Sequence, residues 1–127
     1  MDITSVQSVE DYEFTLFMPD GAKTDIVFKI RSLDCAQAKR VRDKWDAVVA
    51  KSKKGRLSAE QKDQYALNMI KVCVYDWSNM LLDGQPFEYS QENMETLLTD
   101  KRLKWLVDIL ADELMDKNNF LSYSESN

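Results

Sequence analysis

The chain contains no histidine among its 127 residues, and it has only two cysteines. Histidine is the commonest general base and the commonest transition-metal ligand, so its absence argues against most hydrolases and most zinc enzymes. Cys35 and Cys73 stand outside a C-x-x-C spacing and have no histidine to pair with, which excludes a Cys–His nucleophile. Both cysteines fall on apolar faces, which is typical of buried thiols in a reducing compartment. We therefore expect no enzymatic activity, no metal site and no cofactor.

Long apolar runs and export signals are also missing. No stretch comes near the ~20 consecutive apolar residues that a membrane span needs, and residues 1–5 carry neither the basic nor the apolar segment of a signal peptide. We therefore expect a cytoplasmic protein with no membrane partner. A chain of 127 residues can bury a core as a single domain. We assign residues 1–117 to one domain and residues 118–127 to a flexible C-terminal tail, because that end is mostly polar.

Charge is unevenly distributed around the net charge of −5. Residues 35–57 carry eight basic and two acidic side chains, whereas residues 58–127 carry six basic and thirteen acidic ones. Such a block is typical of a nucleic-acid patch or of head-to-tail self-association, and a solvated helix face is the simpler explanation. Sequence-specific DNA binding is disfavoured, because the helix after the basic loop begins with Glu60 and Asp63. The residues predicted to mediate self-association are Lys39, Arg40, Lys44, Lys51, Lys53, Lys54 and Arg56.

Glycine and proline are scarce, with three and two copies, so those present mark turns. Pro19 and Gly21 form a turn signal between two segments, 12–18 and 24–31, in which apolar and polar residues alternate. Alternation of this kind places the apolar side chains on one face of a strand. The two segments therefore predict a β-hairpin with one buried face, which must pack on helices or on a neighbouring sheet to be stable.

Apolar residues recur at helical spacing after the hairpin. Ser32 predicts the N-cap of a first helix that continues into residues 51–54. Trp45 lies at the centre of the apolar stripe of this helix, which indicates a core anchor rather than a ligand platform. The following break, residues 52–56, is polar and contains a glycine, so we expect a surface loop there.

A second helix opens with a capping box, in which Ser58 and Gln61 can each satisfy a free amide of the first turn. Its apolar residues cover most of the helix circumference, which is typical of a central helix. We extend this helix to Trp77. A strand at residues 72–75 is the competing interpretation, and the length of the segment and the capping box favour the helix.

Residues 78–89 interrupt the helical spacing with a turn signal that contains Gly84. Ser90 then predicts the cap of a short helix, and Thr99 or Asp100 predicts the cap of a last helix with a long apolar stripe. The sequence thus predicts an α+β fold, in which an N-terminal β-hairpin is followed by about four helices in a mainly helical single domain.

From Trp77 onward, a tryptophan closes an apolar segment, a turn with glycine and a pair of aromatic residues follow, and Ser-Gln-Glu-Asn opens the next helix. This order of motifs resembles the tail assembly chaperones of long-tailed (siphovirus-type) bacteriophages. The resemblance covers roughly the C-terminal half. It implies a protein of the host cell cytoplasm, absent from the mature virion, that binds the tape measure protein, keeps it soluble and helps to recruit tail tube subunits.

The apolar part of residues 78–89 is the predicted partner-binding surface, because a solvated connector needs fewer apolar side chains. Its residues are Met80, Leu81, Leu82, Phe87 and Tyr89. Packing of these side chains into the core is the alternative interpretation. We expect the tape measure protein and the tail tube protein as partners, and a homo-oligomer of the chain. The alternatives are a small regulatory protein that binds nucleic acid through residues 51–56, and a structural head–tail component of the virion.

Overall fold

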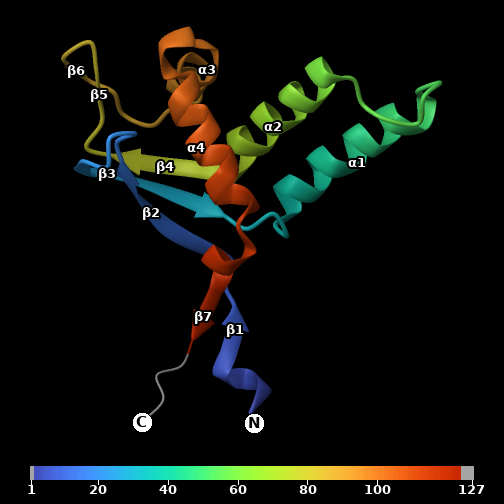
Figure 1. Cartoon of the computed structure of the whole chain (residues 1–127), viewed down its shortest axis with the longest axis horizontal. Coiled ribbons are helices and arrows are strands. Elements are labelled where there is room, and N and C mark those ends of the chain that lie inside the picture. Colours follow the sequence, from blue (N-terminus) through green and yellow to red (C-terminus); the bar gives the residue numbers. More distant parts are fainter. Residues whose placement is uncertain (1, 124–127) are drawn as a thin grey trace.

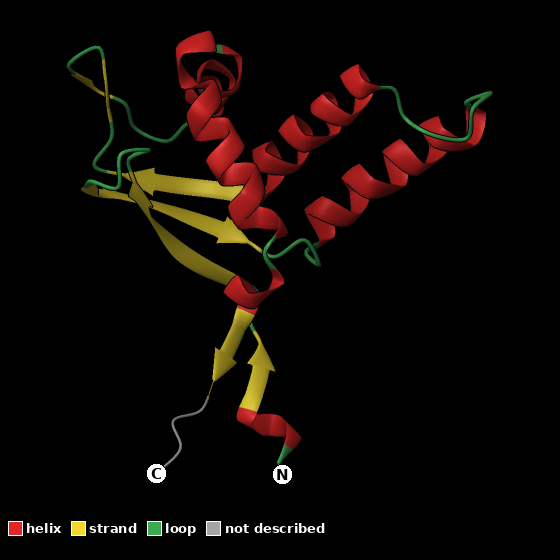
Figure 2. Ribbon diagram, viewed as in Figure 1, coloured by secondary structure: helices red, strands yellow, loops and turns green. Residues whose placement is uncertain are grey.

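The computed structural model describes residues 2–123 and has an α+β fold (Figures 1 and 2). The strands are β1 (Val6–Ser8), β2 (Asp11–Phe17), β3 (Lys23–Arg31), β4 (Val74–Ser78), β5 (Leu81–Leu82), β6 (Gln85–Pro86) and β7 (Leu121–Tyr123). The helices are α1 (Ala36–Lys51), α2 (Ala59–Cys73), α3 (Gln91–Thr99) and α4 (Lys104–Met115), with 3-10 helices η1 (Ile3–Ser5), η2 (Lys101–Leu103) and η3 (Lys117–Phe120). The predicted α+β class is confirmed. The prediction of a mainly helical domain with one hairpin is only partly right, because the strands form three small sheets.

The predicted N-terminal hairpin is confirmed and supplies two strands of the central sheet, whose order is β2-β3-β4. The amide of Gly21 closes its turn by donating to the carbonyl of Met18 over 2.8 Å. Gly21 has a φ of +88°, a conformation that residues with a side chain rarely adopt. The predicted inward face is buried at Leu16, Phe28 and Ile30, whereas Met18 at its end is exposed.

The second predicted helix ends earlier than expected and continues as a strand. The capping box at Ser58 is confirmed, but α2 stops at Cys73, and β4 then runs antiparallel to β3 with Phe28 opposite Trp77. β-Branched Val74 and aromatic Trp77 pack well on a pleated surface. Pairing with β3 also satisfies backbone groups that would otherwise lack partners. The competing strand interpretation was therefore right from Val74 onward.

Two short ribbons complete the strands of the described chain. β5 and β6 pair antiparallel across Asp83 and Gly84, whose φ values of 52° and 78° are those of a type I′ turn. β1 and β7 also pair antiparallel, with Val6 opposite Tyr123. This pairing places the two ends of the described chain side by side (Figure 1).

The sequence predicts a flexible tail over residues 118–127, whereas the structure places residues 118–123 in η3 and β7. Phe120 is buried, and its ring meets that of Tyr12 edge-on with centroids 4.7 Å apart. Burial of the Phe120 ring anchors the segment, because the stabilisation from burying it outweighs the low tendency of the polar residues around it to pack. Residues 124–127 of the predicted tail lie outside the described residues.

The predicted caps are found at Ser58, Ser90 and Asp100, and the first helix differs. Asp100 caps η2, which leads directly into α4. The predicted N-cap Ser32 instead accepts a hydrogen bond from the amide two residues on and forms a turn ahead of the helix. Cys35 is the N-cap, so α1 starts later than the sequence predicts.

α1 and α2 form an antiparallel pair that projects away from the sheet (Figures 1 and 2). We call α1, α2 and the link 52–58 between them the arm. Trp45 of α1 is buried, and its ring lies 6.0 Å from that of Tyr65 on α2. The predicted role of Trp45 as a packing anchor is therefore confirmed.

A single hydrophobic core joins the central sheet to the helices. Phe28 and Ile30 of β3, Ile70 of α2, Leu97 of α3 and Leu110 of α4 are all fully buried in it. No helix in the described part of the chain has the length and apolar character needed to cross a bilayer.

Candidate functional site

The predicted partner-binding segment lies mostly in the core. Phe87 is 6% exposed, stacks on Trp77 with ring centroids 5.5 Å apart, and accepts a hydrogen bond at its carbonyl from the indole Nε1 over 2.6 Å. Met80 is also buried. The half-buried members of the set are Leu82 and Tyr89. Leu81, which is 65% exposed, is the member that solvent reaches freely. The alternative interpretation, in which these side chains pack into the core, therefore holds for Met80 and Phe87.

Charged side chains tie the β5–β6 ribbon to η2. Arg102 places Nη1 2.7 Å from Asp83 Oδ1 and Nη2 2.8 Å from Asp100 Oδ2. Hydrogen bonds from Arg102 hold the pKa of both carboxyl groups below its ordinary value. The guanidinium is exposed, so the pair contributes to the position of the ribbon more than to stability. Leu81 is therefore presented on a ribbon whose turn is fixed to the body.

All seven basic residues predicted for self-association are exposed. Four of them lie along α1, and the structure brings the other three together at the outer end of the arm. There they line a hollow of about 630 Å³, which we call the tip hollow. Its charged lining residues are Lys53, Lys54, Arg56 and Lys62. Among residues 2–123, these four side chains form no salt bridge.

A second hollow, of about 350 Å³, lies between α2 and the end of α4, and we call it the apolar groove. Its lining residues are Leu57, Lys62, Tyr65, Ala66, Met69, Ala111, Leu114 and Met115. Small side chains at Ala66 and Ala111 leave space between the two helices. Met69 is 5% exposed, whereas Met115 is 68% exposed. An open apolar hollow beside an exposed methionine is a surface that apolar side chains of another molecule can fill.

Sequence reasoning missed the apolar groove, although α2 carried a signal for it. Apolar residues cover most of the circumference of α2, which predicts a helix surrounded by other elements. The structure buries Ile70 and Cys73 completely but leaves Tyr65 and Ala66 half-buried at the groove. Part of the apolar surface of α2 is therefore not covered by the chain itself.

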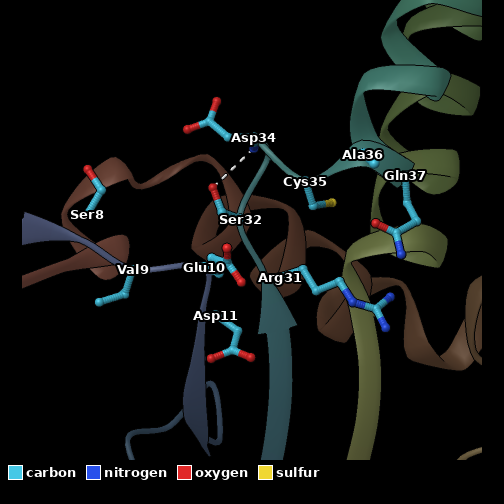
Figure 3. Close-up of a pocket in the computed structure, with 10 residues that line it drawn as sticks. All are labelled: Ser8, Val9, Glu10, Asp11, Arg31, Ser32, Asp34, Cys35, Ala36 and Gln37. Atoms are coloured by element: carbon cyan, nitrogen blue, oxygen red, sulfur yellow. Dashed lines mark hydrogen bonds between the residues drawn. The ribbon is translucent and has the colours of Figure 1, made fainter.

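A polar hollow of about 510 Å³ lies between the β1–β2 link and the β3–α1 link. Figure 3 shows Glu10 and Asp11 on one side and Cys35 at the start of α1 on the other. Several side chains around it make structural contacts. Cys35 Sγ accepts from the amide three residues on over 3.4 Å, and the Arg31 guanidinium lies 4.5 Å from the centroid of the Tyr75 ring. These two groups therefore stabilise the start of α1 and the packing of β3 against β4.

Cys73 is fully buried where α2 meets β4. Burial, with a smaller effect from neighbouring Cys35, raises the pKa of the Cys73 thiol to about 12. A thiol with this pKa stays protonated at neutral pH and is a poor nucleophile. Within residues 2–123, no group of three or more cysteine, aspartate or glutamate side chains is arranged to hold a metal ion.

Comparison of the chain with protein-family models, with curated proteins and with solved structures found no match in any of the three. The structure thus defines an α+β domain with a projecting basic arm and an open apolar groove between α2 and α4.

Proposed function

We propose that the chain is a non-catalytic tail assembly chaperone of a long-tailed bacteriophage. It binds the tape measure protein, keeps it soluble and helps to recruit tail tube subunits. It acts in the host cell cytoplasm and is absent from the mature virion. The observation that carries the proposal is the apolar groove between α2 and α4, which leaves apolar surface open in a small domain with a closed core. The motif order after Trp77 supplies the identity of the partner.

The apolar groove suits a helical segment of a long partner. Two helices line it, so an amphipathic helix can place its apolar side chains between them. Met69 and Met115 provide flexible, polarizable lining that adapts to different helix faces. Covering an apolar stripe of a long helical protein would keep that protein from aggregating.

Co-expression tests this proposal directly. The tape measure protein, produced with and without the full chain, is divided into soluble and insoluble fractions, and the soluble fraction is purified through a tag on the chain. We expect a soluble tape measure protein that co-purifies with the chain and an insoluble one without it. A tape measure protein that is equally soluble in both cases, or that does not co-purify, would contradict the proposal.

Mass spectrometry of purified particles separates a chaperone from a structural component. We expect the chain to be absent from finished virions. A stoichiometric amount in the particle would instead identify it as a head–tail component, which is the structural alternative.

The tip hollow supports a second candidate, nucleic-acid binding. Lys53, Lys54 and Arg56 gather there without salt-bridge partners among the described residues, and unpaired cations of this kind attract phosphates. A gel-shift assay at about 0.15 M salt tests this candidate, since weak phosphate contacts are largely lost at that ionic strength. Retention of the chain on DNA or RNA under these conditions would favour the regulatory alternative.

A further inference from the structure

The tip hollow and the apolar groove are parts of one surface. Both are lined by Leu57 and Lys62, so the two hollows adjoin at these side chains. Apolar side chains line the inner part, and basic side chains line the outer part. A molecule that lies along the groove therefore contacts the basic residues at the outer end of the groove.

The charge of the residues that line the two hollows determines which charged groups such a molecule must carry. The residues lining the two hollows include four basic side chains and no acidic one. Lys53, Lys54 and Arg56 are exposed in the link, and Lys62 is exposed on α2. Because none of them forms a salt bridge within residues 2–123, their charges are available to a partner. Complementarity then requires acidic groups next to the apolar contact.

We propose that the two adjoining hollows together bind an amphipathic helix whose apolar stripe lies in the groove and whose acidic side chains, at one end of that stripe, lie in the tip hollow. The inference rests on the proposed function and specifies the chemistry of the partner segment. Two helices already line the groove, and a third one packs against such a pair through side chains spaced three and four residues apart.

A second copy of this chain fits the surface poorly. α4 is acidic, but its apolar stripe of Leu106, Leu110 and Leu114 is buried, and its Asp108 is paired with Lys104. Exposing that stripe would require α4 to leave its own core. A nucleic acid fits poorly as well, because it would neutralise the basic residues and leave the groove in contact with water. A partner helix of the stated chemistry satisfies both halves of the surface.

The test uses two synthetic helical peptides of about 18 residues, roughly five turns. They share one leucine stripe and differ only in the residues at one end of it, glutamate in the first and lysine in the second. Fluorescence anisotropy gives the Kd of each for the full chain in about 0.15 M salt. We expect the glutamate peptide to bind at least tenfold more tightly than the lysine peptide, and we expect a labelled oligonucleotide not to displace it.

Matched variants locate the site. Met115→Gln and Leu81→Gln replace side chains of similar exposure, 68% and 65%, without adding charge, so the fold is retained in both. Met115→Gln should weaken binding of the glutamate peptide by about tenfold, through lost apolar contact, whereas Leu81→Gln should leave it unchanged. Lys62→Glu should reduce the ratio between the Kd of the lysine peptide and the Kd of the glutamate peptide by about fivefold.

The outcomes separate this inference from the proposed function. Equal binding of the two peptides, loss of binding in Leu81→Gln but not in Met115→Gln, or displacement by the oligonucleotide would overturn the assignment of the surface. If the tape measure protein co-purifies with the chain while neither peptide binds, the function stands and the site is elsewhere. If the glutamate peptide binds as expected and the tape measure protein does not co-purify, the surface stands and the partner is another protein.

Discussion

Adjacent side chains in the segment after β4 have opposite environments. Leu81 is 65% exposed, whereas Met80 is buried and Phe87 packs against Trp77. Side chains of an extended segment alternate between two sides, so one position of a ribbon can belong to the core while its neighbour faces solvent. Substitutions at these positions should therefore differ in their effect on stability, and Phe87→Asp, which would bury a carboxylate, does not leave the fold intact.

Phe87→Ala should lower the free energy of unfolding by about 3–5 kcal/mol, because it leaves a cavity against the Trp77 ring. Leu81→Ala in the same segment is the control, and its effect should stay within about 0.5 kcal/mol. Urea denaturation followed by tryptophan fluorescence measures both. Equal losses in the two variants would mean that Phe87 is not the core residue that its burial indicates.

Tyr12 links the hairpin to the end of α4. Its hydroxyl donates to Glu113 Oε2 over 3.0 Å, and Asn119 Nδ2 donates to the same carboxylate over 2.8 Å. Burial, followed by the charge of Glu113, raises the pKa of Tyr12 above its ordinary value of 10.0. The folded state therefore holds this proton more tightly than the unfolded chain does. Its contribution to stability is complete below about pH 10 and is lost as the pH rises further.

Tyr12→Phe should accordingly be less stable than the original chain at pH 7, and it should lose less stability between about pH 9 and pH 11. Tyr65, Tyr75 and Cys73 also have raised pKa values, and they contribute to the alkaline loss in both chains alike. Denaturant unfolding at a series of pH values compares the two. Parallel pH profiles would show that the Tyr12 hydroxyl does not produce the difference.

At the scale of elements, a local signal decides where α2 begins and a contact far along the chain decides where it ends. The box of Ser58 and Gln61 is visible in sequence, and both hydrogen bonds form in the structure. The end of α2 at Cys73 depends on β3, which pairs with the residues that follow. The hairpin, the caps of α2 and α3 and the course of α4 could therefore be predicted from sequence.

Three of the missed features depend on such distant partners. β4 needs β3, β7 needs β1, and the apolar groove needs α2 and α4 to meet side by side. Periodicity describes one element at a time, so it cannot show which of two apolar faces a later element will cover. For the same reason the exposed Met115 and the buried Phe87 look alike in sequence.

Ser58→Ala should lower the free energy of unfolding by about 1 kcal/mol, because α2 loses the side-chain acceptor for its Gln61 amide. Ser78→Ala is a suitable control, since Ser78 is an exposed strand residue whose backbone makes the pairing. Thermal unfolding followed by circular dichroism measures both variants. A Ser78→Ala chain that is destabilised as much as Ser58→Ala would contradict the assigned role of the cap.

At the scale of the whole molecule, the arm holds the positive charge away from the acidic part of the chain. Four basic residues of α1 and the three of the link are exposed, and Asp112 and Asp116 on and after α4 are exposed as well. The basic residues of one molecule can therefore pair with the acidic residues of another, as the sequence predicts for head-to-tail self-association. Self-association remains a prediction that solution measurements can test.

Oligomers held by these charges should dissociate as salt rises. Exposed ion pairs contribute about 0–1 kcal/mol each and are screened over a Debye length of ~8 Å at physiological ionic strength. Light scattering in low and high salt gives the mass, and Lys39→Glu with Arg40→Glu, which lie on α1 outside the tip hollow, should reduce it in low salt. A mass that is the same at both salt concentrations would contradict charge pairing and would favour a contact between exposed strand edges.

The β1–β7 ribbon gives the chain a defined response to mechanical load. Its antiparallel register puts Val6 and Tyr123 at the outer end, so a pull on both ends of the described chain loads the inter-strand hydrogen bonds one after another. Bonds loaded in series yield at lower force than bonds sheared together. The strands β1 and β7 would therefore separate pair by pair from the outer end while the packed body beyond Phe120 keeps its shape. A pulling force on this chain would open the β1–β7 ribbon before it disturbs the apolar groove.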